Sequence, residues 1–290
     1  MKSVLLVFAH LIFLTSMTTF SSDVHALGSS KRSSAKANRR PNSIRSSSPA
    51  QNGGTCSQFY HDLYSRDAIK IRMVFGYKDA RPARFVGDRH ERLAFINSLT
   101  APCKTGQACG FVRSPENADL FAKDLQVELG RKVRVMVWVV NSSVGSDDEE
   151  NRHDPLQLWR SHYAQAAFES GLSDTDILFY DGHSRFGGGP DFAPPHLNSK
   201  GEVDPAYYTN VRPGVQRLNE KLQAMNKKGA KKSKLKLLGL YSCSSSQHFT
   251  QDVRRYSNVK MISSSNLVYF SDALDESLKK ISQVMERKCI

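Results

Sequence analysis

Two residues with reactive side chains each follow an apolar stretch of the sequence. His183 lies in DILFYDGHSRFGGGPDF, residues 176–192, and Cys243 lies in KLKLLGLYSCSSSQHF, residues 234–249. A thiolate is a strong nucleophile, and a nearby imidazole both lowers the pKa of a thiol and accepts its proton. The pair therefore predicts nucleophilic catalysis, provided that the fold brings the two side chains together.

The two apolar stretches are predicted strands, and they are expected to be neighbours. Successive parallel strands joined by a helix usually lie side by side, roughly 5 Å apart. Ligands of such sheets bind beyond the carboxyl ends of the strands, which places His183 and Cys243 at one crevice. The backbone N–H groups of Ser184 and Cys243 are then candidate donors to a developing oxyanion. A short helix is predicted to begin at Ser245 or Ser246.

The fold class follows from the alternation of predicted strands and helices. Strands are predicted at 68–77, 133–140, 176–180, 235–241 and 259–262, and helices at 88–97, 115–129, 155–170, 213–225 and 271–285. The helix after Ser114 has the clearest signals, namely an N-cap Ser, a first-turn Pro and apolar residues at helical spacing. The helix that begins near Pro155 is expected to pack Trp159 and Tyr163 inward. The pattern predicts an α/β domain with an open, mostly parallel sheet and helices on both faces.

The chain resembles the caspase-like cysteine peptidases, which include caspases, legumains, gingipains and clostripain. In that group a His follows one central strand and a Cys follows the next, as in FYDGHSRFG and LYSCSS, and the separation of 60 residues is close to the caspase spacing of about 50. The resemblance covers roughly residues 69–285 as architecture. It implies a three-layer sandwich and a catalytic dyad of Cys243 and His183 acting on a peptide or protein substrate. The Gly that often follows the family's His precedes it here, as Gly182, and no specificity-pocket residue can be carried over.

The sequence is expected to contain three regions. Residues 1–26 have a Lys, an apolar core and a cleavage-compatible Val24-His25-Ala26, which indicate a signal peptide, so an exported, periplasmic or extracellular protein is expected. No transmembrane segment is expected in the mature chain. Residues 27–55 are rich in Ser, Lys and Arg and are predicted to be a disordered linker. Residues 56–290 are predicted to form a single domain.

The five cysteines suggest a pairing pattern for an exported protein. Cys103 and Cys109 flank the short KTGQA loop, and Cys56 and Cys289 lie at the two ends of the predicted domain, which are often close in space. Two disulfides between these pairs leave Cys243 as the free thiol that a nucleophile requires. A fully reduced protein and an unpaired Cys289 are the alternatives.

The formal net charge of +13 suggests a weak attraction to acidic surfaces. Much of this charge lies in the linker and in residues 226–236, without interleaved aromatic residues that could stack on bases. No specific nucleic-acid partner is therefore expected.

Acidic residues are predicted to lie along the rim of the crevice. Asp181 and Gly182 precede His183, and Asp147 and Asp148 belong to the segment GSDDEENRHDP, which also contains Glu149 and Glu150. This segment is either a solvated acidic loop or a weak calcium site. A zinc site of Asp181, His183 and His248 lacks the usual ligand spacing, so no metal or other cofactor is predicted.

Two functions from different classes fit these features. The first is an exported cysteine-dependent hydrolase, specifically a peptidase with a Cys/His dyad. The alternative is a non-catalytic, envelope-associated binding protein with the same fold and a basic tail that adheres to an acidic surface.

Overall fold

A computed structural model describes residues 44–46, 54–78, 87–103, 108–127, 130–227, 234–256 and 259–290. The chain separates into two units, Met1–Arg40 and Pro41–Ile290, and all of the described residues belong to the second. The predicted signal peptide and most of the predicted linker lie outside them. No helix in these ranges is long and apolar enough to cross a membrane.

The described residues form one mixed sheet of eight strands in the order β1-β8-β7-β6-β2-β5-β4-β3. The strands are β1 (Ile44–Ser46), β2 (Ala68–Phe75), β3 (Val112–Arg113), β4 (Leu120–Gln126), β5 (Lys132–Asn141), β6 (Ile177–Asp181), β7 (Leu237–Tyr241) and β8 (Lys260–Ser264). The central strands β5, β2, β6, β7 and β8 are parallel to one another, and the strands at the two edges pair antiparallel. The predicted α/β class with a mostly parallel sheet is confirmed.

The order of the parallel strands reverses between β2 and β6. The chain passes from β2 to β5 on one side and then returns to the other side of β2 to form β6, β7 and β8. Open α/β sheets bind ligands at such a switch point, beyond the carboxyl ends of the strands. The ends of β2 and β6 are therefore the part of the sheet best suited to a site.

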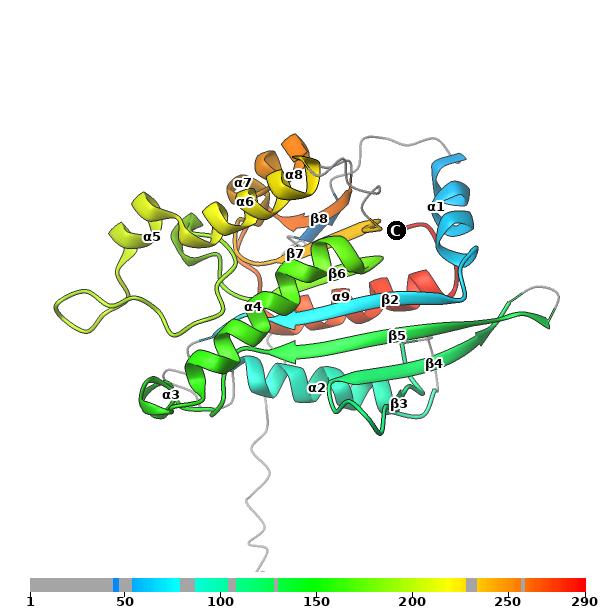
Figure 1. The fold of residues 1–290 in the computed structure, drawn as a ribbon, viewed down its shortest axis with the longest axis horizontal. Coiled ribbons are helices and arrows are strands. Elements are labelled where there is room, and N and C mark those ends of the chain that lie inside the picture. Colours follow the sequence, from blue (N-terminus) through cyan, green and yellow to red (C-terminus); the bar gives the residue numbers. More distant parts are fainter. Residues whose placement is uncertain are drawn as a thin grey trace, which may run out of the picture. The chain divides into compact units, whose positions relative to one another are not determined.

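Helices cover both faces of the sheet (Figure 1). The helices are α1 (Gly54–Tyr64), α2 (Asp88–Thr100), α3 (Asp148–His153), α4 (Gln157–Asp174), α5 (Pro205–Val211), α6 (Pro213–Lys227), α7 (Ser245–His248), α8 (Thr250–Tyr256) and α9 (Phe270–Met285), with a short 3-10 helix η2 (Arg185–Gly187). Side chains of α1, α2 and α9 pack on one face, and those of α4, α6 and α8 pack on the other. The result is the predicted three-layer arrangement.

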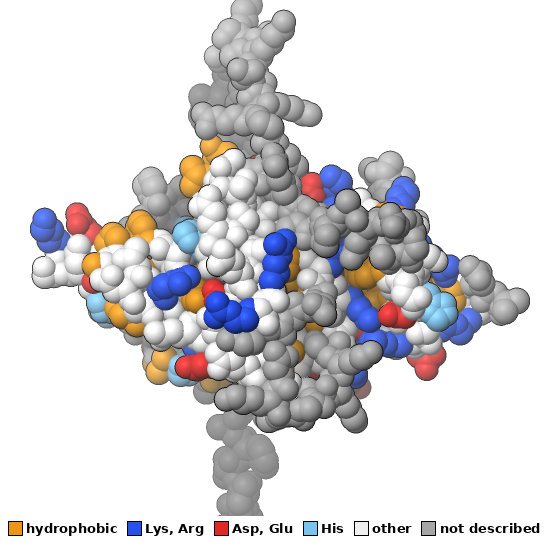
Figure 2. Space-filling view, turned by 90° about the horizontal axis from the view of Figure 1, so that it is seen from above, with side chains coloured by type: hydrophobic (Ala, Val, Ile, Leu, Met, Phe, Trp, Pro, Cys, Tyr) orange, Lys and Arg blue, Asp and Glu red, His pale blue; other side chains and the backbone are white. Residues whose placement is uncertain are grey.

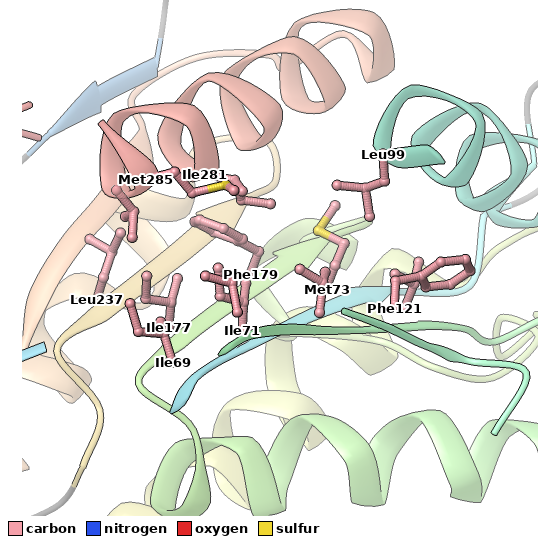
Figure 3. Close-up of a cluster of buried hydrophobic side chains, with 14 of the residues drawn as sticks. Ile69, Ile71, Met73, Leu99, Phe121, Ile177, Phe179, Leu237, Ile281 and Met285 are labelled. Atoms are coloured by element: carbon pink, nitrogen blue, oxygen red, sulfur yellow. The ribbon is translucent and has the colours of Figure 1, made fainter. Parts of the chain in front are cut away.

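Alternation along the strands divides the buried side chains between two cores. Odd-numbered residues of β2 and β6 point toward α2 and α9, where Met73 and Phe179 lie among Leu99 and Ile281 (Figure 3). Even-numbered residues of β6 point toward α4 and α6. Because both faces are covered, these strands are apolar at almost every position, which is why the sequence predicts them well.

The second core also contains a buried charge, Arg72 of β2. Its guanidinium donates to Ala167 O and to Ser170 Oγ at 2.6 Å, and it lies over the ring of Trp138 at 5.3 Å. Acceptors on α4 thus satisfy the two terminal nitrogens of a group that is costly to bury, whereas its Nε has no partner among the described residues.

The prediction of a helix at residues 115–129 is wrong. This segment contains β4, which pairs antiparallel with β5, and the Ser114 N–H donates to Leu120 O in a turn. Phe121 and Leu125 contact the core that α2 and α9 cover. A spacing of four places two residues on one face of a helix and also on one face of a strand, so the apolar pattern could not separate the two.

Three further predictions differ from the structure in detail. Trp159 was expected on the inner face of α4 but is 60% exposed and stacks on Tyr163 at 5.5 Å. Ser271 was predicted to cap the last helix. The N-cap of α9 is instead Tyr269, whose side chain makes no capping hydrogen bond. Within the predicted linker, Ile44–Ser46 forms β1 against β8.

Candidate functional site

The two predicted catalytic residues follow adjacent strands whose ends are level with each other. The register of β6 with β7 ends with Asp181 opposite Tyr241, and the Gly182 N–H donates to Tyr241 O at 3.2 Å. His183 and Cys243 each follow this last pair by two residues. Asp181 and Tyr241 both face the α2 and α9 side of the sheet, and His183 and Cys243 lie in the turns directly beyond these two strands. The His183 ring lies beside Phe270 of α9, on that same side.

The backbone around His183 is held by two aromatic residues. The Tyr180 hydroxyl donates to His183 O at 2.9 Å, and the ring of Phe270, at the start of α9, lies edge-on to the imidazole at 6.2 Å. Gly182 permits this packing, because a Cβ there would stand 2.4 Å from Tyr180 Oη. The imidazole itself is half-buried.

Cys243 lies in a tight turn between β7 and α7. Ser244 has a left-handed backbone with φ of 52°, and its N–H donates to Asn266 O at 2.9 Å. The buried Ser245 hydroxyl donates to Leu240 O at 2.7 Å and accepts from the Ser264 N–H at 2.9 Å. These bonds fix the turn to the ends of β7 and β8, and α7 begins at Ser245 as predicted.

The two predicted oxyanion donors are backbone N–H groups that are not engaged in hydrogen bonds with described residues. Neither the Ser184 N–H nor the Cys243 N–H has a hydrogen-bond acceptor in the part of the chain that the structure describes. Buried backbone donors are almost always paired, and Ser184 is buried. Unpaired N–H groups beside a His and a Cys suit a developing negative charge on a substrate carbonyl.

A buried ionic triad lies beneath His183. Lys78, which follows β2, donates to Asp181 Oδ1 at 2.7 Å and to Glu91 Oε2 from α2. All three side chains are at least nine-tenths buried. The Lys78 Nζ also lies 4.0 Å from the centre of the Phe270 ring, which contacts the imidazole of His183. The triad therefore joins β2, α2 and β6 at the switch point and supports the wall behind His183.

Burial and mutual repulsion keep a proton on this triad. Desolvation, and then the nearby Asp181 carboxylate, raise the pKa of Glu91 to about 9. Burial also raises the pKa of Asp181, against the opposing effects of the Lys78 charge and of the hydrogen bond from Lys78. Glu91 Oε1 and Asp181 Oδ2 are both buried without a hydrogen-bond partner among the described residues. The raised pKa of Glu91 therefore favours its protonated form at neutral pH, beside the Lys78 ammonium.

Other buried polar atoms gather near the ends of β6 and β7. Tyr241 Oη and Ser242 Oγ are buried without a hydrogen-bond partner in the described ranges. Desolvation raises the pKa of Tyr241 well above its usual value. Buried polar groups left unpaired are rare in proteins and are expected at functional sites more than elsewhere.

The predicted disulfides are confirmed. Cys56 pairs with Cys289, with Cα atoms 5.7 Å apart, and Cys103 pairs with Cys109, with Cα atoms 5.2 Å apart. Cys243 is the free cysteine and is half-buried.

The acidic residues predicted at the rim have structural roles. Asp181 is buried in the triad, and Asp148 is buried and accepts a hydrogen bond from the Tyr77 hydroxyl at 2.7 Å. Asp147 caps α3 by accepting from the N–H groups of Glu149 and Glu150. This segment is a short helix instead of a solvated loop.

The residues of the weighed zinc site are engaged with other parts of the fold. The ring of His248 fills the space beside Gly187, where a Cβ would stand 2.8 Å from Nδ1, and Asp181 is bound to Lys78. Burial, and then the charge of Arg212, lower the pKa of His248. No group of three or more His, Cys, Asp or Glu side chains with metal-binding geometry occurs among the described residues.

Lys78, Glu91 and Phe270 were not recognised from the sequence. Lys78 directly follows the strand predicted at 68–77. A Lys at the carboxyl end of a buried strand is only a weak indication of a buried ion pair. Its partners come from α2, β6 and α9, which lie far apart in the sequence, so only the fold identifies them.

The basic side chains do not form one continuous surface on the face shown in Figure 2. Among the described residues, Lys and Arg lie there in several separate groups.

Comparison with known proteins identifies no relative of this chain, so a functional assignment depends on the geometry of the candidate site. No protein-family model matches the chain, and no curated protein is significantly similar to it.

Proposed function

We propose that this protein is an exported cysteine-dependent hydrolase, specifically a peptidase, with Cys243 as the nucleophile and His183 as the general base. The observation that carries the proposal is the register of β6 and β7, since both residues stand two positions beyond the last pair of the ladder. The two N–H groups without acceptors beside them support the same assignment.

The proposed reaction uses four groups. His183 takes the proton of the Cys243 thiol, and the thiolate sulfur attacks the carbonyl carbon of the substrate. The N–H groups of Ser184 and Cys243 donate to the oxygen that becomes negative, each contributing about 3 kcal/mol in favourable cases. His183 then protonates the leaving amine as the C–N bond breaks. Water, deprotonated by His183, hydrolyses the thioester and restores the thiol.

The resemblance to caspase-like peptidases is part of the proposal. The expected arrangement, a His after one central strand and a Cys after the next, corresponds to β6 and β7 of the parallel sheet. Ser184 takes the place of the Gly that often follows the family's His. Export is supported by the two disulfides, because such bonds persist mainly in oxidising compartments.

The test is the alkylation rate of Cys243 by iodoacetamide in the folded protein. An imidazole that lowers the thiol pKa by one unit gives about tenfold more thiolate below that pKa. We expect Cys243 to react about tenfold faster in the wild type than in His183→Ala. The matched control is His248→Ala, which removes another half-buried His near the same sheet edge and is expected to leave the rate unchanged. Equal rates in all three proteins contradict the dyad.

Hydrolysis is then measured with a peptide library. Cys243→Ala is expected to abolish cleavage while circular dichroism shows an intact fold, because Cys243 lies in a turn outside the packed cores. A reactive Cys243 with no cleavage of any peptide favours the alternative, a non-catalytic binding protein.

A further inference from the structure

One loop lies beside both residues of the proposed dyad. The N–H of the residue after Cys243 donates to Asn266 O at 2.9 Å, and the ring of Phe270 lies edge-on to the imidazole of His183 at 6.2 Å. Asn266 and Phe270 both belong to the segment that leads from β8 into α9. We call residues 266–270 the β8 loop. It lies beyond the carboxyl ends of the parallel strands, where ligands of open α/β sheets bind.

The β8 loop exposes large apolar side chains. Leu267 is 68% exposed and Tyr269 is 60% exposed, whereas Val268 between them packs against the core that α2 and α9 cover. Tyr269 is the N-cap residue of α9, a position that usually carries a small polar residue, and its side chain makes no capping hydrogen bond. The helix therefore does not account for the tyrosine, and much of its side chain is accessible to a ligand.

A further exposed aromatic residue lies just beyond His183 along the chain. Phe186 is 54% exposed and belongs to η2, which begins two residues after His183. It has a left-handed backbone with φ of 53°, as does Arg185 with φ of 42°. Such a backbone is unfavourable for bulky residues, and it persists where the surrounding structure imposes it, often at functional sites.

Buried contacts hold Phe186 in this conformation. Arg185 Nε donates to Asp191 Oδ2 at 2.8 Å, and both side chains are largely buried. Gly187 lies against the ring of His248, where a Cβ would stand 2.8 Å from Nδ1, and His248 ends the short helix α7 that follows β7. The backbone on both sides of Phe186 is thus fixed, while much of its side chain remains in solvent.

Two of the segments beside the dyad contain no charged residue. The β8 loop is Asn-Leu-Val-Tyr-Phe, and residues 242–247, which include Cys243, are Ser-Cys-Ser-Ser-Ser-Gln. A charged side chain of a substrate finds no counter-ion in either segment, whereas an apolar one buries surface against Leu267 and Tyr269. Single exposed apolar residues are normal in proteins, but several beside a few polar reactive groups are typical of ligand sites.

From these features we infer that the proposed peptidase takes peptides with a large apolar side chain, aromatic or aliphatic, next to the bond that is cleaved. Leu267 and Tyr269 contact that side chain, and Phe186 adds a second apolar contact beyond His183. The inference rests on the proposed function, since it names the class of substrate that Cys243 attacks.

The test compares two reagents, tosyl-phenylalanyl chloromethyl ketone and tosyl-lysyl chloromethyl ketone. Both alkylate a thiol with loss of chloride, and they differ only in the side chain. Mass spectrometry gives the rate for Cys243 in the folded, oxidised protein, and each rate is divided by that of the same reagent with free cysteine. We expect the phenylalanyl reagent to react about tenfold faster than the lysyl reagent, the effect of a modest apolar contact. Equal normalised rates overturn the inference.

Three variants remove the exposed apolar side chains without loss of packing. Tyr269→Ser places a favoured N-cap residue at the start of α9, and Phe186→Gly places the favoured residue at a left-handed position. Leu267→Ser changes an exposed loop residue, and its matched control is Leu158→Ser, a residue of α4 that is 66% exposed. We expect Tyr269→Ser and Leu267→Ser to lose most of the preference for the phenylalanyl reagent and Phe186→Gly to lose part of it. Leu158→Ser is expected to keep the preference.

Iodoacetamide separates this inference from the proposed function, because it carries no amino-acid side chain and reports the reactivity of the thiol alone. Equal iodoacetamide rates in the wild type and in His183→Ala contradict the dyad, while the ratio of the two chloromethyl ketones still reports the apolar surface. An unchanged ratio in both Tyr269→Ser and Leu267→Ser overturns the inference. The same holds if Leu158→Ser lowers the ratio equally, since the reagent then binds apolar surface without regard to position.

Discussion

Replacing Lys78 by Met tests whether the buried triad holds the site together. The substitution keeps most of the side-chain volume but removes the ammonium from two carboxyl groups that have almost no contact with solvent. Removing one partner of a buried ion pair typically costs 3–5 kcal/mol, because the remaining charge is left without compensation. In a domain of this size that corresponds to a fall in Tm of roughly 10 °C.

The measurement is urea denaturation at neutral pH, followed by circular dichroism. Glu91→Gln is the matched control, because Glu91 already holds a proton at neutral pH, so that a neutral amide of the same shape is expected to change stability little. A loss of less than about 1 kcal/mol in Lys78→Met would refute the reasoning that the ammonium compensates these carboxyls.

The pH dependence provides a second arm of the same experiment. Glu91 releases its proton near its ordinary pKa of 4.5 when unfolded but only near 9 when folded. The folded protein thus binds more protons in this window, so the contribution of Glu91 to stability is complete below 4.5 and declines as the pH rises toward 9. The decline has an upper limit of about 1.4 kcal/mol per pH unit. Glu91→Gln is expected to flatten it, and equal profiles for the two proteins would show that Glu91 is ionised in the fold.

Two further changes have defined outcomes. Gly182→Ala places a Cβ 2.4 Å from Tyr180 Oη and is expected to lower stability and slow alkylation of Cys243, whereas Gly201→Ala, with open space around it, is expected to cost only about 1 kcal/mol from its positive φ. Similar unfolding midpoints for the two alanine variants would contradict the packing argument. Replacing Cys56 and Cys289 by Ser is expected to cost 2–5 kcal/mol in the same denaturation assay, and an unchanged midpoint would mean that the bond adds no stability.

The central part of the fold could be predicted from the sequence because its strands are buried on both faces. Runs such as those of β5, β6 and β7 have few polar interruptions, and each is followed by a polar or glycine-containing turn. The positions of His183 and Cys243 after neighbouring strands followed from this pattern. The edge of the sheet was less predictable, because β4 is partly exposed and its Phe121 and Leu125 fit a helix equally well.

The surroundings of the candidate site depend on contacts between distant segments. Lys78 and Asp181 are 103 residues apart in the sequence, and Phe270 comes from yet another element. No local pattern records such a pairing. Cysteine spacing, by contrast, was informative because five cysteines cannot all pair within one molecule, which restricts the possible disulfides.

The bond between Cys56 and Cys289 makes the domain a closed covalent ring, since it links residues 233 positions apart. A single cut of the backbone anywhere between them does not release a fragment. It produces one molecule of nearly unchanged mass, with new ends at the cut and with Cys56 and Cys289 still joined through sulfur. Nicked protein therefore stays intact on a non-reducing gel and separates into two pieces only after reduction. The domain can lose continuity in a connecting loop and still keep both halves of the sheet, with His183 on β6 and Cys243 on β7, in one molecule.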